Sequence, residues 1–590
     1  MKHICFFYIL KYRSIRDVGI SLDARYRYVV NEKRKTISIT EGNRTASSLW
    51  PVGISSFAAI VGNNGAGKST CMLYMLQAMA QGSGEKDPEA IVIYQDEDGM
   101  HVYIPQASGY SLDKRTQDIC RVTYDCPHVD MFYYSSYFRP YQYAHEPGEG
   151  ELAGVYNASD TWRLIKDYQD YANVDATYRT EPIGYHLDAM KSQDDNRIVQ
   201  LLYDNELRKL LPRNALPRYI IVEPNMSGYR RTWFEESKRN PNDVDLYVPQ
   251  FGASKDDRLA CIVTMILYNI GVECGKSYPS TKNDIERWAQ AFWSNKDIVS
   301  ALAMFMQEPH LEIQFTREMQ EIVVFLSKAC EYAPVTNSLY IDMQLIKNKE
   351  NMERLRSYYM YKSFVTAHYF DLGYAHRRSS ATQLSSGEFD MLKFFSRIYD
   401  AVFEFPRRFD NIYSPQLILI DEAENSYHPE WQRKFVNLLL KFMHAVHFRC
   451  KGDKDFQIVL TTHSPILLSD IPNACVNYLE KHQTAVQVVK NQPETFGTNV
   501  FELYKHAFFM KEGLIGEFAQ NKILAIQYAI ENQTQPVGEI IDAIELIGDK
   551  AIKAYLLSLL ERDFPREMVS YHQRKIKELT ERADAADKQK

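Results

Sequence analysis

Residues Gly62 to Ser69 read GNNGAGKS and fit the pattern G-x-x-x-x-G-K-[ST] of a phosphate-binding loop. An apolar run precedes the loop and a helical pattern follows it, which is the context that such a loop needs. Its backbone N–H groups can wrap phosphate oxygens, and the helix N-terminus adds a positive partial charge. We expect Lys68 to reach the β- and γ-phosphates of a nucleotide and the Ser69 hydroxyl to bind Mg²⁺. The predicted nucleotide-binding residues are Gly62, Asn63, Asn64, Gly65, Ala66, Gly67, Lys68, Ser69 and Thr70.

A second candidate site is a pair of carboxylates, Asp421 and Glu422, which end the apolar run LILI at residues 417–420. Asp421 would emerge beside the phosphate-binding loop and hold its Mg²⁺ through water. Glu422 lies one residue further on and points elsewhere, so its expected role is that of a general base that polarises the attacking water. Taken alone, the same residues also fit a core strand that meets a solvated loop. The phosphate-binding loop favours the catalytic interpretation.

A third apolar strand pattern, at residues 457–460, is followed by Thr461, Thr462 and His463. Open α/β sheets bind their ligands at the carboxyl ends of the strands. His463 is therefore suited to sense a γ-phosphate or to orient the attacking water. The alternative is a structural histidine. The expected catalytic residues are Lys68, Glu422 and His463.

Strand and helix patterns place these motifs on one sheet. Predicted strands cover residues 4–10, 26–30, 36–39, 57–61, 91–94, 101–104, 417–420 and 458–460, and 91–104 reads as a β-hairpin. Predicted helices cover residues 68–80, 161–171, 284–307, 316–330, 349–368 and 429–448. Strand patterns are sparse between about 150 and 370, and no heptad repeat persists there. After about residue 500 the pattern is helical.

Bulk composition sets limits on the class of protein. A chain of 590 residues is too long for one compact core, so several structural units are expected. A formal net charge of −7 excludes a uniformly basic DNA-coating surface but allows a local basic groove. The nine cysteines form no C-x-x-C pair, which favours a reducing cytoplasm over a zinc or disulfide framework. No apolar run reaches the roughly 18 residues that span a bilayer. We expect a cytoplasmic protein with no membrane partner.

The stretch LSSGE at residues 384–388 adds a fourth motif. Read alone, its two serines are good N-cap residues and its glutamate suits a first helical turn. Beside the three strand-end motifs, it resembles the signature of the ABC-type ATPase head in the SMC/RecF/OLD branch, which is usually Leu-Ser-Gly-Gly-Gln. The resemblance covers roughly residues 1–145 and 370–490. The implied signature residues are Ser385, Ser386, Gly387 and Glu388.

This resemblance implies an α/β fold, namely an ABC-ATPase head with a mixed sheet and a P-loop core, a large mainly helical insertion and a helical C-terminal segment. The implied domains are an N-terminal lobe (1–145), the insertion (146–370), a C-terminal lobe with signature, carboxylates and histidine (371–490), and a helical region (491–590). It also implies slow, regulatory, Mg²⁺-dependent hydrolysis of ATP to ADP and phosphate. Heads of this kind pair, so each ATP would lie between residues 62–69 of one copy and 384–388 of another. A homodimer or a higher even-numbered oligomer follows.

Finer features, such as THSP at 462–465, HP at 428–429 and TFGTN at 495–499, look like the Septu and retron-associated AAA ATPases of bacterial antiphage defence. That resemblance implies a sensor or regulator of a separately encoded nuclease of the HNH type, with DNA or retron nucleic acid as a further candidate partner. The alternative is a RecF-like DNA-repair ATPase that binds DNA directly. Two arginine pairs, 230–231 and 377–378, are candidate contacts for it, although such pairs are more typical of charged helix faces.

One element of the family pattern has two candidate positions. A glutamine that senses Mg²⁺ after a strand is either Gln95 or is replaced by a residue within 131–138. Residues 476–590 show no clustered carboxylates of a nuclease domain, so the chain is expected to lack its own nuclease.

Overall fold

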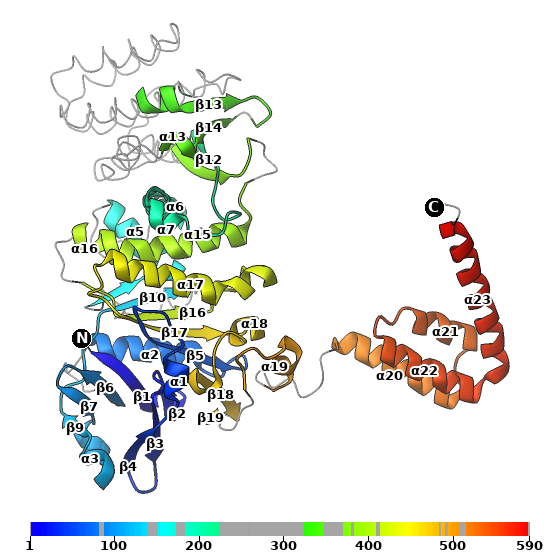
Figure 1. The fold of residues 1–590 in the computed structure, drawn as a ribbon, viewed down its shortest axis with the longest axis horizontal. Coiled ribbons are helices and arrows are strands. Elements are labelled where there is room, and N and C mark those ends of the chain that lie inside the picture. Colours follow the sequence, from blue (N-terminus) through cyan, green and yellow to red (C-terminus); the bar gives the residue numbers. More distant parts are fainter. Residues whose placement is uncertain are drawn as a thin grey trace, which may run out of the picture. The chain divides into compact units, whose positions relative to one another are not determined.

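The computed structural model describes residues 2–81, 88–137, 152, 154–172, 183–224, 259, 324–336, 338–346, 370–378, 383–408, 413–482, 485–489, 494–506 and 515–587. The chain forms two compact units, Met1–Phe509 and Met510–Lys590 (Figure 1). The four predicted domain ranges remain predictions. Within the ranges described, no helix is long and apolar enough to cross a membrane.

A seven-stranded sheet lies at the centre of the first unit. Its strand order is β11-β10-β16-β17-β5-β18-β19. The strands are β5 (Ile54–Gly62), β10 (Met131–Ser135), β11 (Val155–Asn157), β16 (Leu417–Asp421), β17 (Phe456–Thr462), β18 (Val476–His482) and β19 (Ala485–Val489). All neighbours are parallel except β18 and β19. In the register, Ser135 pairs with Asp421 and Asp421 pairs with Thr461, so the carboxyl ends of these strands meet at one edge.

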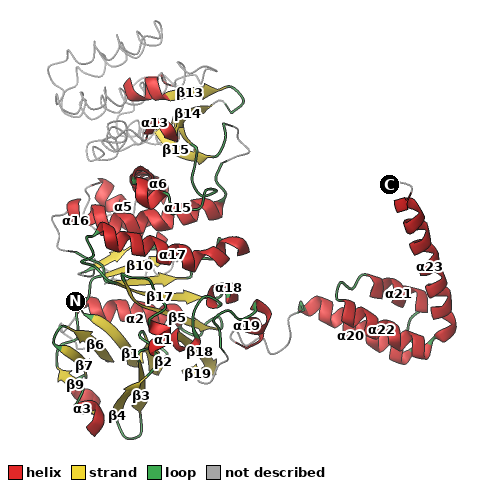
Figure 2. Ribbon diagram, in the orientation of Figure 1, coloured by secondary structure: helices red, strands yellow, loops and turns green. Residues whose placement is uncertain are grey.

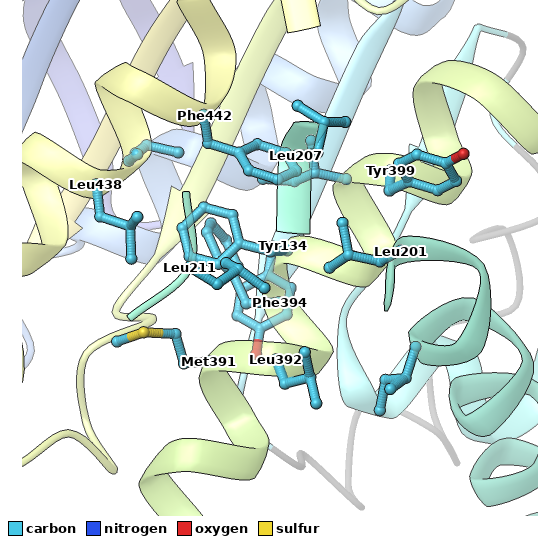
Figure 3. Close-up of a cluster of buried hydrophobic side chains, with 14 of the residues drawn as sticks. Tyr134, Leu201, Leu207, Leu211, Met391, Leu392, Phe394, Tyr399, Leu438 and Phe442 are labelled. Atoms are coloured by element: carbon cyan, nitrogen blue, oxygen red, sulfur yellow. The ribbon is translucent and has the colours of Figure 1, made fainter. Parts of the chain in front are cut away.

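Both faces of this sheet are buried, which explains why its strands read as continuous apolar runs. Along β16, Ile418 and Ile420 belong to one core cluster, whereas Leu417 and Leu419 belong to another. The first cluster packs under α15 (Ser386–Tyr399), α17 (Pro429–Arg449) and α6 (Ile183–Tyr203), and part of it is drawn in Figure 3. The second packs under α2 (Lys68–Gln81) and strand β1 (His3–Tyr12). The expected α/β fold is confirmed, with helices and strands in layers (Figure 2).

A five-stranded sheet and a three-stranded sheet complete the N-terminal part. Their orders are β2-β1-β6-β7-β9 and β3-β4-β8. The further strands are β2 (Ile15–Ser21), β3 (Tyr26–Asn31), β4 (Thr36–Glu41), β6 (Ala90–Asp96), β7 (Gly99–Tyr103), β8 (Ser111–Leu112) and β9 (Cys120–Thr123). The predicted hairpin at residues 91–104 is confirmed, since β6 and β7 pair antiparallel. Short helices in this part are α1 (Arg44–Ser47), η1 (Gln106–Ser108) and α3 (Lys114–Gln117).

The segment predicted to be sparse in strands contains a four-stranded antiparallel sheet, which sequence patterns missed. Its order is β13-β14-β12-β15, from β12 (Tyr219–Pro224), β13 (Cys330–Ala333), β14 (Ser338–Asp342) and β15 (Phe370–Ala375). The predicted helix 161–171 is confirmed as α5 (Asp160–Ala172). The prediction 316–330 was wrong at its end, because Cys330 opens β13. The predicted helices 284–307 and 349–368 lie outside the described residues. Nearby helices are α7 (Asn205–Arg208) and α13 (Met343–Ile346).

Buried charges fasten α15 to α5 and α6. This arginine cluster consists of Arg197, Arg397, Asp160, Asp167, Asp194 and Asp400. Arg397, which has no exposed surface, donates two hydrogen bonds of 2.9 and 2.6 Å to Asp194. Arg197 in turn donates at 2.9 Å to Asp194. One carboxylate therefore joins the two guanidinium groups. Beyond α15 the chain continues as η4 (Asp400–Glu404), a π-helix, and α16 (Phe405–Arg408).

The rest of the first unit and all of the second are mainly helical. The first unit adds α18 (Pro465–Leu468), η5 (Asn473–Cys475) and α19 (Val500–His506). The second contains α20 (Glu517–Asn532), α21 (Val537–Glu545), α22 (Lys550–Asp563) and α23 (Pro565–Asp587), which share a small core of their own. The helical pattern predicted after residue 500 is confirmed for the residues described.

Candidate functional site

The phosphate-binding loop joins β5 to α2 at the carboxyl edge of the seven-stranded sheet. Gly65 and Gly67 have φ angles of 77° and 86°, a region that strongly favours glycine. Lys68 begins α2, and its side chain is only 4% exposed. Its ammonium donates at 3.1 Å to the carbonyl of Gly62, which holds the side chain back across the loop. The loop thus has the turn, the helix N-terminus and the buried cation that a phosphate site requires.

Asp421 lies beside the start of α2, as the sequence predicts. The Ser69 hydroxyl donates to one carboxylate oxygen at 2.9 Å, and Thr461 donates to the same oxygen at 2.6 Å. Tyr133 donates to the other oxygen at 3.4 Å. Hard divalent cations prefer hydroxyl and carboxylate oxygens of this kind. Ser69 and Asp421 therefore fit a Mg²⁺ ion, and they are the residues that would hold it.

Glu422 lies at the same edge but faces a different set of groups. Its φ angle is 50°, a left-handed conformation that is uncommon for a residue with a side chain. Its backbone N–H donates to Thr461, and its carboxylate lies 3.7 Å from the ammonium of Lys68 and accepts at 3.4 Å from Asn425. Strained backbone held by such contacts is concentrated at functional sites.

The His463 side chain contacts both Lys68, which follows β5, and Glu422, which follows β16. Its Nε2 atom lies 2.6 Å from Lys68 Nζ and 3.0 Å from Glu422 Oε1. A single ring nitrogen can accept a proton from the lysine or donate one to the carboxylate, but it cannot do both at once. The Nε2 atom therefore has two alternative hydrogen-bonding roles, as acceptor from Lys68 or as donor to Glu422.

These contacts change the acidity of the charged groups. Burial alone would raise the pKa of Glu422, but the hydrogen bond and charge of His463 and the charge of Lys68 outweigh it and bring that pKa to about 2. Burial lowers the pKa of Lys68, and the charges of the nearby carboxylates oppose that change. Glu422 is thus held as a carboxylate in contact with a cation, the form that a general base must have.

The signature segment does not join this cluster within one chain. Ser385 is the N-cap of α15, and Glu388 closes a capping box with it: the Ser385 N–H donates to the Glu388 carboxylate at 2.8 Å. Glu388 also lies 3.7 Å from His376. A side chain on Gly387 would come within 2.7 Å of the backbone oxygen of Ser426, so the loop after Glu422 excludes any larger residue there. Glu388, where the signature usually has glutamine, thus has a local role as the acidic residue of this capping box.

Sequence reasoning missed several groups of the site. Thr461 and Tyr133 bind Asp421, Asn425 binds Glu422, and Glu424 is buried just behind them. Their positions next to the predicted strand ends were the available signal.

The structure also bears on two open alternatives. Gln95 lies on β6 of the five-stranded sheet, whereas β10 ends at the catalytic edge, where Ser136 donates at 3.3 Å to the carbonyl of Glu422. Residues 131–137 thus end beside Glu422, residue 138 lies outside the described residues, and the assignment of the Mg²⁺-sensing residue stays a prediction. Of the basic pairs, Arg378 forms an ion pair with Glu331 and lies 5.0 Å from the ring centre of Tyr219. Residues 230–231 lie outside the described residues.

Comparisons with known proteins identify one part of the chain. Residues 274–469 match a family model described as "AAA domain, putative AbiEii toxin, Type IV TA system". This range contains the signature segment, both strand-end carboxylates and His463, and it follows the phosphate-binding loop. About a third of the chain is thus similar to an AAA domain.

One curated protein, ea59 of Escherichia phage lambda, is 26% identical over 129 residues, which is 22% of this chain and 21% of that protein. The match therefore spans about a fifth of that relative. Among solved structures, the Smc head domain bound to the C-terminal domain of ScpA, from Pyrococcus furiosus, is 11% identical, with 83% and 96% of the two chains covered and a TM-score of 0.23. The recombination mediator protein RecF is also 11% identical, with 83% of this chain and 98% of that chain covered and a TM-score of 0.22. The fold of this chain is therefore defined by its own sheets and helices and not by these similarities.

Proposed function

We propose that this chain is a regulatory ATPase that binds Mg²⁺ and ATP at the carboxyl edge of its seven-stranded sheet and hydrolyses the nucleotide slowly. The supporting observation is the convergence of Lys68, Glu422 and His463 from the ends of β5, β16 and β17 on one edge, where Asp421 also contacts Ser69. The AAA match supports the reaction class.

Each group has a role that its contacts support. The phosphate-binding loop and Lys68 hold the β- and γ-phosphates, Ser69 and Asp421 hold Mg²⁺, and the ion neutralises charge on the phosphates. Glu422 accepts a proton from the attacking water, and His463 orients that water or the γ-phosphate. Lys68 must leave its contacts with Glu422 and His463 to reach the phosphates, so nucleotide binding frees both of these groups.

We further propose that two copies pair head to head. The Ser385 hydroxyl and the N-terminus of α15 would then contact the γ-phosphate held by the other copy. The support is that Ser385 caps the N-terminus of α15, which suits an anion, and that the contact described for its hydroxyl lies within α15 and not at the phosphate-binding loop of its own chain. Pairing and ATP binding would stabilise each other.

The biological role follows from the finer resemblance. We propose that the ATPase senses or restrains a separately encoded HNH-type nuclease in bacterial antiphage defence. The family description, which names a putative toxin of a type IV toxin–antitoxin system, supports a role as one component of a larger system. The pairing of Arg378 with Glu331 gives no support to a RecF-like DNA groove at that place.

Mixing of two inactive variants tests the shared site. Lys68→Ala removes the phosphate cation, and Ser385→Arg blocks the signature contact, so each variant alone should lose hydrolysis. A mixture should regain about a quarter of wild-type activity, because random pairing puts half of the chains in mixed dimers with one intact composite site each. No recovery in the mixture, with both variants shown to exchange subunits, would contradict the head-to-head arrangement.

A separate experiment tests the partner. Affinity purification from the native host should recover a nuclease together with the chain. Recovery of replication or repair proteins alone would favour the RecF-like alternative. ATPase activity that DNA stimulates, with a steep dependence on salt, would point to direct DNA binding.

A further inference from the structure

Glu424 is a buried carboxyl group that the proposed reaction does not use. It lies two residues after Glu422, is 3% exposed, and its carboxyl accepts hydrogen bonds from the Thr462 hydroxyl and from the backbone N–H of His463. Buried carboxyl groups are costly unless they are paired, so this position needs a reason. The groups that it binds are the two residues that end β17.

The turn that carries His463 is fastened on its other side too. The Ser464 N–H donates to the Thr462 hydroxyl at 2.9 Å, and the Ser464 hydroxyl donates to Gln432 of α17 at 2.8 Å. Gln432 in turn donates at 3.0 Å to the carbonyl of Tyr427. The backbone around His463 is therefore held on one side by Glu424 and on the other by Gln432 of α17.

The ring of His463 is less constrained than its backbone. The side chain is 32% exposed, and the contacts described for the ring are those with Lys68 and Glu422. Both of these partners are expected to change when ATP binds. The position of the ring then depends on how firmly its own backbone is fixed.

We propose that Glu424 is a positioning residue, whose buried carboxyl fixes the backbone of His463 and so holds the imidazole at the reacting phosphate. The inference rests on the proposed function, because the position of the ring matters only in a chain that turns ATP over. Glu424 touches neither nucleotide nor water in this role. It acts through the two hydrogen bonds that it accepts.

Kinetics of Glu424→Ala test the proposal. We expect kcat to fall about 10- to 100-fold, as is usual when a supporting hydrogen bond behind a reacting group is lost. The KM for ATP should stay within about twofold, because the phosphate-binding loop is untouched. Glu424→Gln keeps a carbonyl oxygen that can accept from the Thr462 hydroxyl and should restore most of kcat. Unchanged kcat in the alanine variant, or no rescue by glutamine, would overturn the proposal.

A second readout follows the histidine directly. In protein labelled at histidine Cε1, the signal that His463→Gln removes should shift in Glu424→Ala but not in Glu424→Gln. Thr462→Val, which removes one of the two donors, should shift it as well and serves if the alanine variant does not fold. Asp23→Asn is the matched control: this buried carboxyl, bonded to His3 and Arg25, should lower stability without moving the signal.

The two readouts separate failure of the inference from failure of the proposed function. A wild-type protein without ATPase activity would contradict the proposed function, and the histidine signal would still decide the role of Glu424. An active wild-type protein whose His463 signal is the same in Glu424→Ala would contradict the inference alone.

Discussion

Two groups of buried charges lie in the first unit, and they are built differently. In the arginine cluster, Arg197 and Arg397 each face more than one carboxylate, and Asp194 serves both. The second group, called the catalytic cluster here, consists of Lys68, Asp421, Glu422 and His463. One nitrogen of His463 lies within hydrogen-bonding distance of both Lys68 and Glu422 and can form a hydrogen bond with only one of them at a time.

The two clusters differ in whether their side chains have an alternative set of hydrogen-bond partners. Guanidinium groups remain charged and offer several donors in a fixed plane, so the arginine cluster has one satisfied state. The catalytic cluster combines an ammonium, an imidazole and two carboxylates, whose protons can move. We infer that the first cluster holds α15 in place, whereas the second is able to exchange partners when a phosphate arrives.

The largest expected effect is on turnover. Glu422→Gln keeps the size of the side chain but removes the base, so kcat should fall about 10²- to 10⁴-fold. ATP binding should persist. Steady-state hydrolysis and nucleotide-binding measurements check this together. Near-normal turnover would contradict the assignment of Glu422 as the base.

The matching change in the arginine cluster should act on stability instead. Arg397→Ala breaks the pairs with Asp194 and Asp160 and leaves these carboxylates to Arg197 and Lys393 respectively, which costs about 3 to 5 kcal/mol of unfolding free energy. Chemical denaturation measures it. Arg433→Ala, which breaks an exposed pair with Glu430, is the control and should have no measurable effect. Equal effects of the two changes would contradict the distinction between buried and exposed pairs.

A third test concerns pH. Burial raises the pKa of Glu424 to about 7, although the hydrogen bond from Thr462 opposes the change. Between pH 4.5 and 7 the folded chain holds a proton that the unfolded chain has lost, so stability is full below 4.5 and declines as the pH rises through 7. The contribution is roughly 3 kcal/mol.

Glu424→Gln cannot ionise and should lack this decline. Denaturation of both proteins at pH 5, 6, 7 and 8 measures the difference in slope. Parallel slopes would show that the carboxyl group of Glu424 does not hold a proton in this range.

The smallest expected effect on stability is at the start of α15. Ser385→Ala removes the N-cap and should cost about 1 kcal/mol, whereas Ser385→Asp keeps a cap. Both lack the serine hydroxyl that would reach the γ-phosphate, so both should lose hydrolysis. An aspartate variant with full activity would mean that Ser385 is a cap and nothing more.

Local signals predicted much of the fold and the candidate site. The phosphate-binding loop, the carboxylates and His463 each follow an apolar strand, and parallel strands bring their carboxyl ends together, so the meeting of these groups follows from the pattern. The pattern did not predict that Gly387 packs closely against another loop, because its close neighbour is the backbone of Ser426, about 40 residues away in the sequence. Glu424 looked like a loop residue until its contact with Thr462 was known.

The four-stranded sheet was missed for a related reason. Its strands are only four to six residues long, and β12 pairs with β14 and β15, which lie more than a hundred residues further along the chain. The local pair of β13 and β14 is too short to give a periodic signal that distinguishes it from a loop or a helix end. Residues 324–329 are helical and run directly into β13, which extended the predicted helix too far.

The pairing of β12 with β15 also bears on how this protein can vary. Val222 lies opposite Leu372 and Glu223 opposite Asp371, so the chain leaves the head at β12 and returns beside the same point at β15. The stretch between these two strands therefore starts and ends at adjacent points. A change in the length of such a stretch need not move the strands at its base, nor the carboxyl edge of the seven-stranded sheet.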